Sequence, residues 1–119
     1  MSLNKFYTIN DMLMNDSGLS CRIVFNPEHD IFKGHFPAQP VVPGVCMVEI
    51  VKELLQQNTG KHLLLKQAGN VKFLRLIIPA TQPEVDLSWK SLESGYFVNV
   101  TFKEAGTILF KMDGTYDFV

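Results

Sequence analysis

The feature that most constrains this fold is one helix-length segment followed by strand-like alternation to the end of the chain. Val45–Gln57 runs for thirteen residues without glycine or proline. Pro43-Gly44 precedes it and Asn58-Thr59-Gly60 follows it, which is typical of a helix start and of a left-handed helix end. The first turn is apolar on every side, and this predicts that the start of the helix is buried.

Strands are expected on both sides of the helix. Ser20–Asn26 alternates apolar and polar residues, whereas residues 1–19 are weakly patterned apart from a turn at 15–18. Four prolines between Pro27 and Pro43 predict an ordered loop. After the helix, the expected strands are Leu63–Ala68, Val71–Ile78, Val85–Leu92, Tyr96–Lys103 and Thr107–Tyr116. A bend or bulge at 69–70 and glycine-bearing hairpin loops at 93–95 and 104–106 separate them.

This order of elements predicts an α+β protein with one helix and an antiparallel sheet. The chain has 119 residues, so a single domain over residues 1–119 is expected. One helix cannot cover both faces of such a sheet, and the uncovered edge or face favours pairing with a second copy of the chain.

Composition excludes several functional classes. Hydrophobic residues make up 46% of the chain and charged residues 19%, with a formal net charge of -1. A globular protein is therefore expected, and nucleic-acid binding is not. No apolar run approaches the roughly 20 residues of a membrane span, and no signal peptide is visible, so a cytoplasmic protein is expected. Cys21 and Cys46 lack metal-ligand spacing and are expected to be reduced thiols.

The segment before the helix holds the residue types that acid–base chemistry needs. Three prolines within seven residues stiffen the loop that follows His35. The first amide N–H groups of a helix have no partner within it, so those of Gly44 or Val45 could bind an oxygen that becomes negative during a reaction. Glu49 is the first charged residue of the helix. A base, a carboxyl group and an oxyanion site together suit proton removal beside a carbonyl.

Each of these residues also has a structural explanation. Glu49, Lys52, Glu53 and Gln56 follow helical spacing and could form one solvated face. A loop histidine bonded to backbone is as reasonable for His35 as a catalyst, and helix-start geometry alone accounts for Gly44. His29 and His62 are expected to be exposed and without a role.

The whole segment GHFPAQPVVPGVCMVE, residues 34–49, resembles the active-site signature of β-hydroxyacyl-acyl-carrier-protein dehydratases of fatty-acid synthesis. Its histidine and glutamate are separated by the same fourteen positions. Residues 70–75, NVKFLR, and Ile78-Pro79 resemble the next strand and loop of that family. The resemblance covers residues 20–116.

The resemblance implies a hotdog fold, in which an antiparallel sheet wraps around one long central helix. It also implies a homodimer with active sites at the interface, and it leaves open whether dimers assemble further, as in a trimer of dimers. His35 of one subunit and Glu49 of the other would be the catalytic pair. Gly44, Val45, Phe36 and Pro43 would bind the substrate.

The implied reaction is dehydration of a (3R)-hydroxyacyl thioester to the trans-2-enoyl thioester, with no metal or organic cofactor. The acyl chain would arrive on acyl carrier protein, an acidic partner. Lys33, Lys72 and Arg75 could contact that carrier or could be ordinary surface cations.

The sequence departs from the family pattern in ways that affect the substrate more than the chemistry. Ala38 replaces a glycine of the motif, Ile50 and Val51 replace small residues, and Glu53 stands where glutamine is usual. Other hotdog activities are alternatives. Residues 26–29, NPEH, faintly resemble an enoyl-hydratase element, although Val24 stands in place of its aspartate. A thioesterase or a non-catalytic carrier-binding subunit is also considered.

Overall fold

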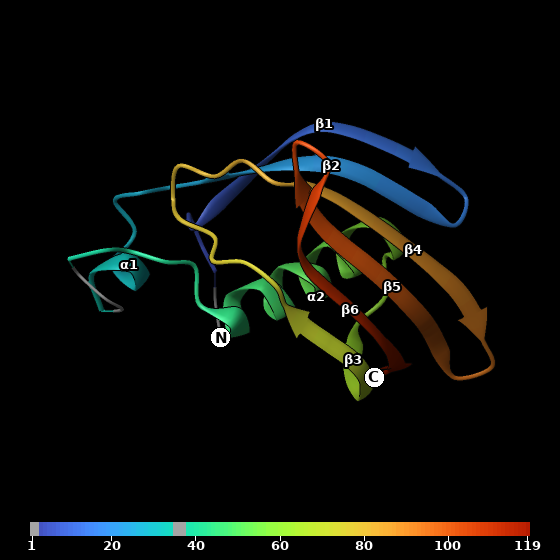
Figure 1. Cartoon of the computed structure of the whole chain (residues 1–119). Coiled ribbons are helices and arrows are strands. Elements are labelled where there is room, and N and C mark those ends of the chain that lie inside the picture. Colours follow the sequence, from blue (N-terminus) through green and yellow to red (C-terminus); the bar gives the residue numbers. More distant parts are fainter. Residues whose placement is uncertain (1–2, 35–37) are drawn as a thin grey trace.

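A computed structural model describes residues 3–34 and 38–119, and its main feature is a six-stranded antiparallel sheet curved around one helix (Figure 1). The strand order is β1-β2-β4-β5-β6-β3, so β1 and β3 are the two edges. The elements are β1 Tyr7–Asn15, β2 Gly18–Phe25, α1 Asp30–Gly34, α2 Gly44–Thr59, β3 Leu63–Phe73, β4 Glu84–Leu92, β5 Gly95–Glu104 and β6 Thr107–Phe118. This architecture confirms the expected α+β fold with one long helix.

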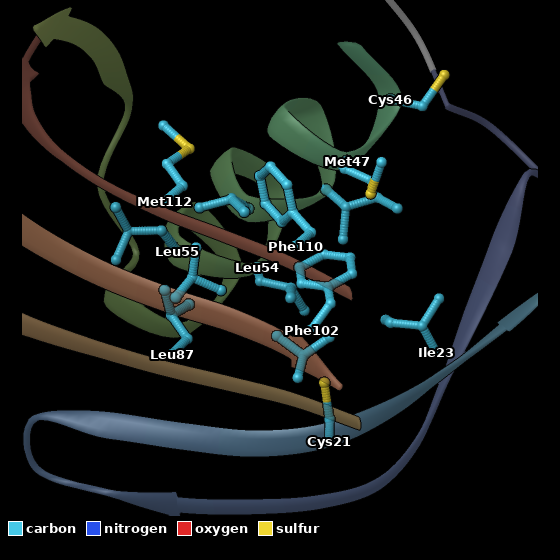
Figure 2. Close-up of a cluster of buried hydrophobic side chains, with 14 of the residues drawn as sticks. Cys21, Ile23, Cys46, Met47, Leu54, Leu55, Leu87, Phe102, Phe110 and Met112 are labelled. Atoms are coloured by element: carbon cyan, nitrogen blue, oxygen red, sulfur yellow. The ribbon is translucent and has the colours of Figure 1, made fainter. Parts of the chain in front are cut away.

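Helix α2 supplies the centre of the core. Its buried face consists of Cys46, Met47, Ile50, Val51, Leu54 and Leu55. Figure 2 shows several of these side chains directed toward Phe102 and Phe110 of the sheet. The expected burial of the first turn is only half right, because Val45 keeps 62% of its surface exposed. Gly60 ends the helix at φ 71°, and its N–H donates to the carbonyl of Gln56.

Two elements were not expected from the sequence. Strand β1 pairs with β2, but the pairing shifts between Asn10 and Leu13, and Asp11 has a φ of 55°. This irregularity breaks the two-residue alternation by which a strand is recognised. Helix α1 is a single short turn inside the segment that was expected to be loop throughout.

The expected strand Val71–Ile78 is wrong at its end, because β3 stops at Phe73. The amides of Leu74 and Arg75 both donate to the carbonyl of Leu109, so the chain leaves the regular pairing there. The carbonyl of Ile77 instead accepts from Val42 at 2.7 Å. That bond ties the segment after β3 to the loop that leads into α2.

The two cysteines are buried free thiols, as expected. Burial raises the pKa of the Cys21 thiol to about 11. Neither helix in the described part of the chain has the length and hydropathy of a membrane span.

Candidate active site

The described part of the candidate site begins at the start of α2. His35 and Phe36, the predicted base and one predicted substrate contact, lie outside the described residues. Pro43 precedes the helix with φ -62° and ψ 144°, and no side chain caps this end. Its carbonyl accepts from the amides of Cys46 at 3.0 Å and Met47 at 3.4 Å.

The N–H groups of Gly44 and Val45 have no acceptor among the described residues. These are the two donors that the sequence predicted for an oxyanion. A helix start with free N–H groups attracts negative charge, because the aligned peptide dipoles leave about half a positive charge there. The arrangement is therefore able to hold a thioester oxygen as charge develops on it.

Phe73 also belongs to this region; it lies in the segment 70–75 that resembles the family, but no role in the site was predicted for it. A Cβ atom placed on Gly44 would lie 2.8 Å from Cε1 and Cζ of the Phe73 ring, so the ring rests against the glycine. The ring packs on Phe110 with centroids 5.1 Å apart, yet Phe73 stays 52% exposed. Glycine at position 44 thus allows both a bare amide and a close aromatic neighbour.

Glu49 lies one to two turns into α2 and is half-buried, so it is neither a core residue nor a fully solvated one. Its negative charge contributes to raised pKa values of three neighbouring groups. Burial and then the Glu49 charge raise the pKa of the Tyr116 hydroxyl to about 12. The same two causes raise the pKa of the Cys46 thiol. Glu49 also adds a small upward effect on the pKa of Tyr7, which burial and Glu53 raise most.

Two tyrosines therefore border the acidic side of α2, and they differ in hydrogen bonding. The Tyr7 hydroxyl donates to Oε1 of Glu53 at 2.7 Å, which joins β1 to the helix. The Tyr116 hydroxyl is buried, and no partner for it exists among the described residues. Glu53, which departs from the family pattern, thus has a phenol partner in this chain.

The three predicted partner-binding cations lie in two separate parts of the chain. Lys33 is on α1, where its Nζ is 3.6 Å from Oδ1 of Asp30. Lys72 is on β3, directly opposite Lys111 of β6, and Arg75 follows the end of β3. A cationic surface is thus possible near β3 without Lys33.

The enoyl-hydratase resemblance at residues 26–29 is explained by local structure. The Asn26 side chain donates to the carbonyl of Lys5 and accepts from the amide of Glu28, each at 3.0 Å. His29 was expected to be exposed and without a partner, whereas it is half-buried and has several partners. Its Nδ1 accepts from the amide of Ile31, its Nε2 lies 2.9 Å from the carbonyl of Asn4, and its ring packs edge-on against Phe6. These contacts hold α1 in place.

An open apolar depression of about 430 Å³ borders the motif loop. Its lining residues come from the segment after β2, the loop before α2 and the segment after β3, namely Pro27, Ala38, Gln39, Pro40, Ile78, Pro79 and Ala80. The hydrogen bond from Val42 to Ile77 holds two of these segments together.

Comparison with known protein families shows which family has this sequence pattern. The family model described as ApeI-like, the ApeI dehydratases, matches residues 11–110. This chain belongs to the ApeI-like dehydratase family. The match includes the motif loop, the start of α2 and most of the sheet, so the resemblance seen in the sequence is confirmed at the level of the family.

Individual relatives agree with this assignment. The chain is 36% identical over 64 residues to the 3-hydroxyacyl-[acyl-carrier-protein] dehydratase FabZ of Clostridium acetobutylicum, covering 48% of this chain and 44% of that protein. It is 41% identical over 56 residues to FabZ of Rickettsia massiliae, covering 40% of this chain and 39% of that protein. The chain thus matches less than half the length of these curated relatives.

A solved structure confirms the hotdog fold. The dehydratase heterocomplex ApeI:P from Xenorhabdus doucetiae superposes with a TM-score of 0.79, at 17% identity, over 93% of this chain and 97% of that chain. A likeness at this identity supports the fold.

Proposed function

We propose that this protein dehydrates a (3R)-hydroxyacyl thioester, carried on acyl carrier protein, to the trans-2-enoyl thioester in fatty-acid or related lipid synthesis. The observation that carries the proposal is the start of α2. There, two N–H groups without acceptors in the described structure follow the motif loop, and Glu49 lies one to two turns further along.

Each residue has a defined role in this reaction. His35 removes the α-proton of the thioester, and the electron pair of that C–H bond forms the new double bond. The Gly44 or Val45 N–H stabilises the thioester oxygen while it carries negative charge. The β-hydroxyl departs with a proton from Glu49 and leaves as water. Phe36 and Pro43 are proposed to contact the substrate beside these groups.

A second copy of the chain is proposed to complete the site. β3 is an edge strand, and the chain from its last residues to Ile78 exposes apolar side chains to solvent. These side chains are Val71, Phe73, Leu74, Leu76 and Ile78. An unpaired strand edge with exposed apolar residues favours pairing with another strand. We propose a homodimer in which His35 of one subunit meets Glu49 of its partner.

Two variants test the chemistry directly. His35→Ala and Glu49→Gln are each expected to keep the fold and to lose about 10²- to 10⁴-fold in rate. The measurement is loss of absorbance at the enoyl thioester band when the reaction is run toward hydration, with circular dichroism to verify folding. A folded His35→Ala variant with a near-normal rate would reject the proposed role of His35.

The same assay separates elimination from hydrolysis. Release of free thiol from an enoyl or hydroxyacyl thioester would indicate a thioesterase. Carrier binding without any turnover would indicate a non-catalytic subunit. The proposed dehydratase interconverts the two acyl forms and leaves the thioester intact.

A further inference from the structure

A broad hollow of the described surface lies away from the candidate active site. A depression of about 690 Å³ is lined by residues from all strands of the sheet. The side chains on this surface alternate along each strand with buried core residues such as Leu87, Val100 and Met112. The hollow therefore lies on the face of the sheet opposite α2.

One row of directly paired residues crosses this outer face. Leu13 of β1 pairs with Ser20 of β2, and Lys72 of β3 pairs with Lys111 of β6. The complete row is Leu13, Ser20, Asp86, Thr101, Lys111 and Lys72. An exposed apolar side chain thus stands at one end of the row, hydroxyl groups lie within it, and two cations stand at the other end.

The two lysines are a pair of like charges on neighbouring strands. Directly opposed like charges destabilise a sheet unless something neutralises them. In the described structure neither Lys72 nor Lys111 forms an ion pair. The acids nearby are already engaged, since Asp86 lies 2.9 Å from Nζ of Lys103 and Asp113 accepts two hydrogen bonds from Asn70. The pair is therefore left with uncompensated positive charge.

The pair also lies close to the candidate site through the thickness of the sheet. Phe73 and Phe110 form the next cross-strand pair, on the opposite face, and the Phe73 ring rests against Gly44. A partner held at Lys72 and Lys111 would thus sit on the same two strands that cover the start of α2.

We infer that the row ending in Lys72 and Lys111 is the docking surface for an acidic acyl carrier protein, with Lys111 as a contact that the sequence did not indicate. This inference rests on the proposed function, because the carrier is the expected bearer of the substrate. Carboxylates of the carrier pair with the two lysines, and an apolar carrier side chain contacts Leu13, which is 72% exposed.

The experiment compares one acyl group on two supports. The trans-2-enoyl chain is offered on acyl carrier protein and on N-acetylcysteamine, a short thiol without a protein surface. The double variant Lys72→Glu/Lys111→Glu is expected to raise KM for the carrier-bound substrate about tenfold and to leave kcat/KM for the short thioester unchanged. The matched control is Lys61→Glu/Lys90→Glu, which changes the net charge equally at two exposed lysines outside this row.

A direct measurement of carrier binding tests the docking surface separately from the proposed dehydratase function. If the unaltered chain converts neither thioester, the proposed function fails, and calorimetric titration with loaded carrier decides the docking surface alone. Loss of carrier binding in the Lys72→Glu/Lys111→Glu variant, with retention in the control, supports the surface. Equal binding by both variants would overturn it. The two proteins are also titrated with inorganic phosphate. If the Lys72→Glu/Lys111→Glu variant loses phosphate binding but keeps carrier binding, the lysine pair is a small-anion site and the proposed docking surface is overturned.

Discussion

At the scale of single residues, Glu49 and Glu53 on the acidic side of α2 differ in their hydrogen bonding. Glu53 accepts a hydrogen bond from Tyr7, and this bond joins the helix to an edge strand. Glu49, one turn earlier, has no hydrogen bond or ion pair with any described residue. A carboxyl group kept free of structural partners is available for a substrate, whereas a bonded one is committed to the fold.

Loss of the hydroxyl group is expected to affect the stability of the fold differently at the two tyrosines beside these acids. Tyr7→Phe removes a bond to a carboxylate and is expected to lower the free energy of unfolding by about 1 to 2 kcal/mol. Tyr116→Phe removes a buried hydroxyl without a described partner and is expected to be neutral or stabilising. Chemical denaturation at pH 7 measures both. A larger loss for Tyr116→Phe than for Tyr7→Phe would show that the Tyr116 hydroxyl has a partner after all.

The raised pKa of Tyr116 leads to a prediction of how the free energy of unfolding changes at alkaline pH. Its pKa is raised from 10.0 to about 12 in the folded chain, so the unfolded chain releases this proton first. Below pH 10 this titration leaves the free energy of unfolding unchanged, and as pH rises toward 12 it lowers that free energy by roughly 2 to 3 kcal/mol. Tyr116→Phe is expected to flatten the fall in unfolding free energy over this range. Parallel curves for the two proteins would contradict the assignment.

Gly44 and Phe73 are expected to be coupled. Alanine at position 44 displaces the Phe73 ring, which costs about 0.5 to 1.5 kcal/mol of aromatic packing, but it is a better helix former by about 1 kcal/mol. Gly44→Ala is therefore expected to change stability little while lowering activity. In a Phe73→Ala background the same change should be stabilising. A double-mutant cycle measures the difference, and additive effects would show that the ring does not contact Gly44.

At the scale of elements, β3 connects the assembly edge, the outer face and the candidate site. A bend or bulge was expected at 69–70, and the register shift between Ala68 and Val71 shows a bulge there. Asp113 of β6 holds the bulge, since its carboxylate accepts from the amide of Asn70 at 3.2 Å and from its side chain at 3.1 Å. The bulge is thus a defined part of the sheet and sets how β3 continues toward Phe73.

This contact makes a specific prediction for the bulge. A Cβ atom on Gly69 would collide with Oδ1 of Asp113, which its bonds to Asn70 hold in place. Gly69→Ala is therefore expected to destabilise the fold by about 1 to 3 kcal/mol. Asp113→Ala alone loses the two hydrogen bonds, but it should make Gly69→Ala far less costly. Thermal unfolding of the two single variants and the double variant tests this, and fully additive losses would contradict the proposed collision.

The elements also show what a sequence can and cannot predict here. Helix α2 and strands β4 to β6 were predicted because each carries a regular apolar period that begins after a turn or loop containing glycine or proline. β1 was missed since its bulge at Asp11 interrupts the alternation, and α1 was missed because its stability comes from Asn26, His29 and Phe6 rather than from its own five residues. Contacts between distant segments, such as Phe73 on Gly44, leave no local pattern.

At the scale of the whole molecule, the candidate site is incomplete within one chain if the proposed pairing is correct. The motif that contains His35 and the helix that carries Glu49 belong to one continuous segment, yet the proposed chemistry takes one residue from each subunit. A symmetric dimer built on β3 would contain two equivalent sites. The Xenorhabdus dehydratase is a heterocomplex, and the identity of the second subunit is therefore a question to test for this chain.

Complementation between inactive variants answers that question. His35→Ala and Glu49→Gln are mixed in equal amounts after gentle dissociation, and random pairing yields half heterodimers. Each heterodimer has one site with both substitutions and one site with neither, so about a quarter of the native activity is expected to return. Mixing either variant with itself serves as the control. If both residues of a site belong to the same subunit, mixing restores nothing. A monomeric chain that becomes active only with a different hotdog subunit would contradict the homodimer and would place the second half of the site in that partner.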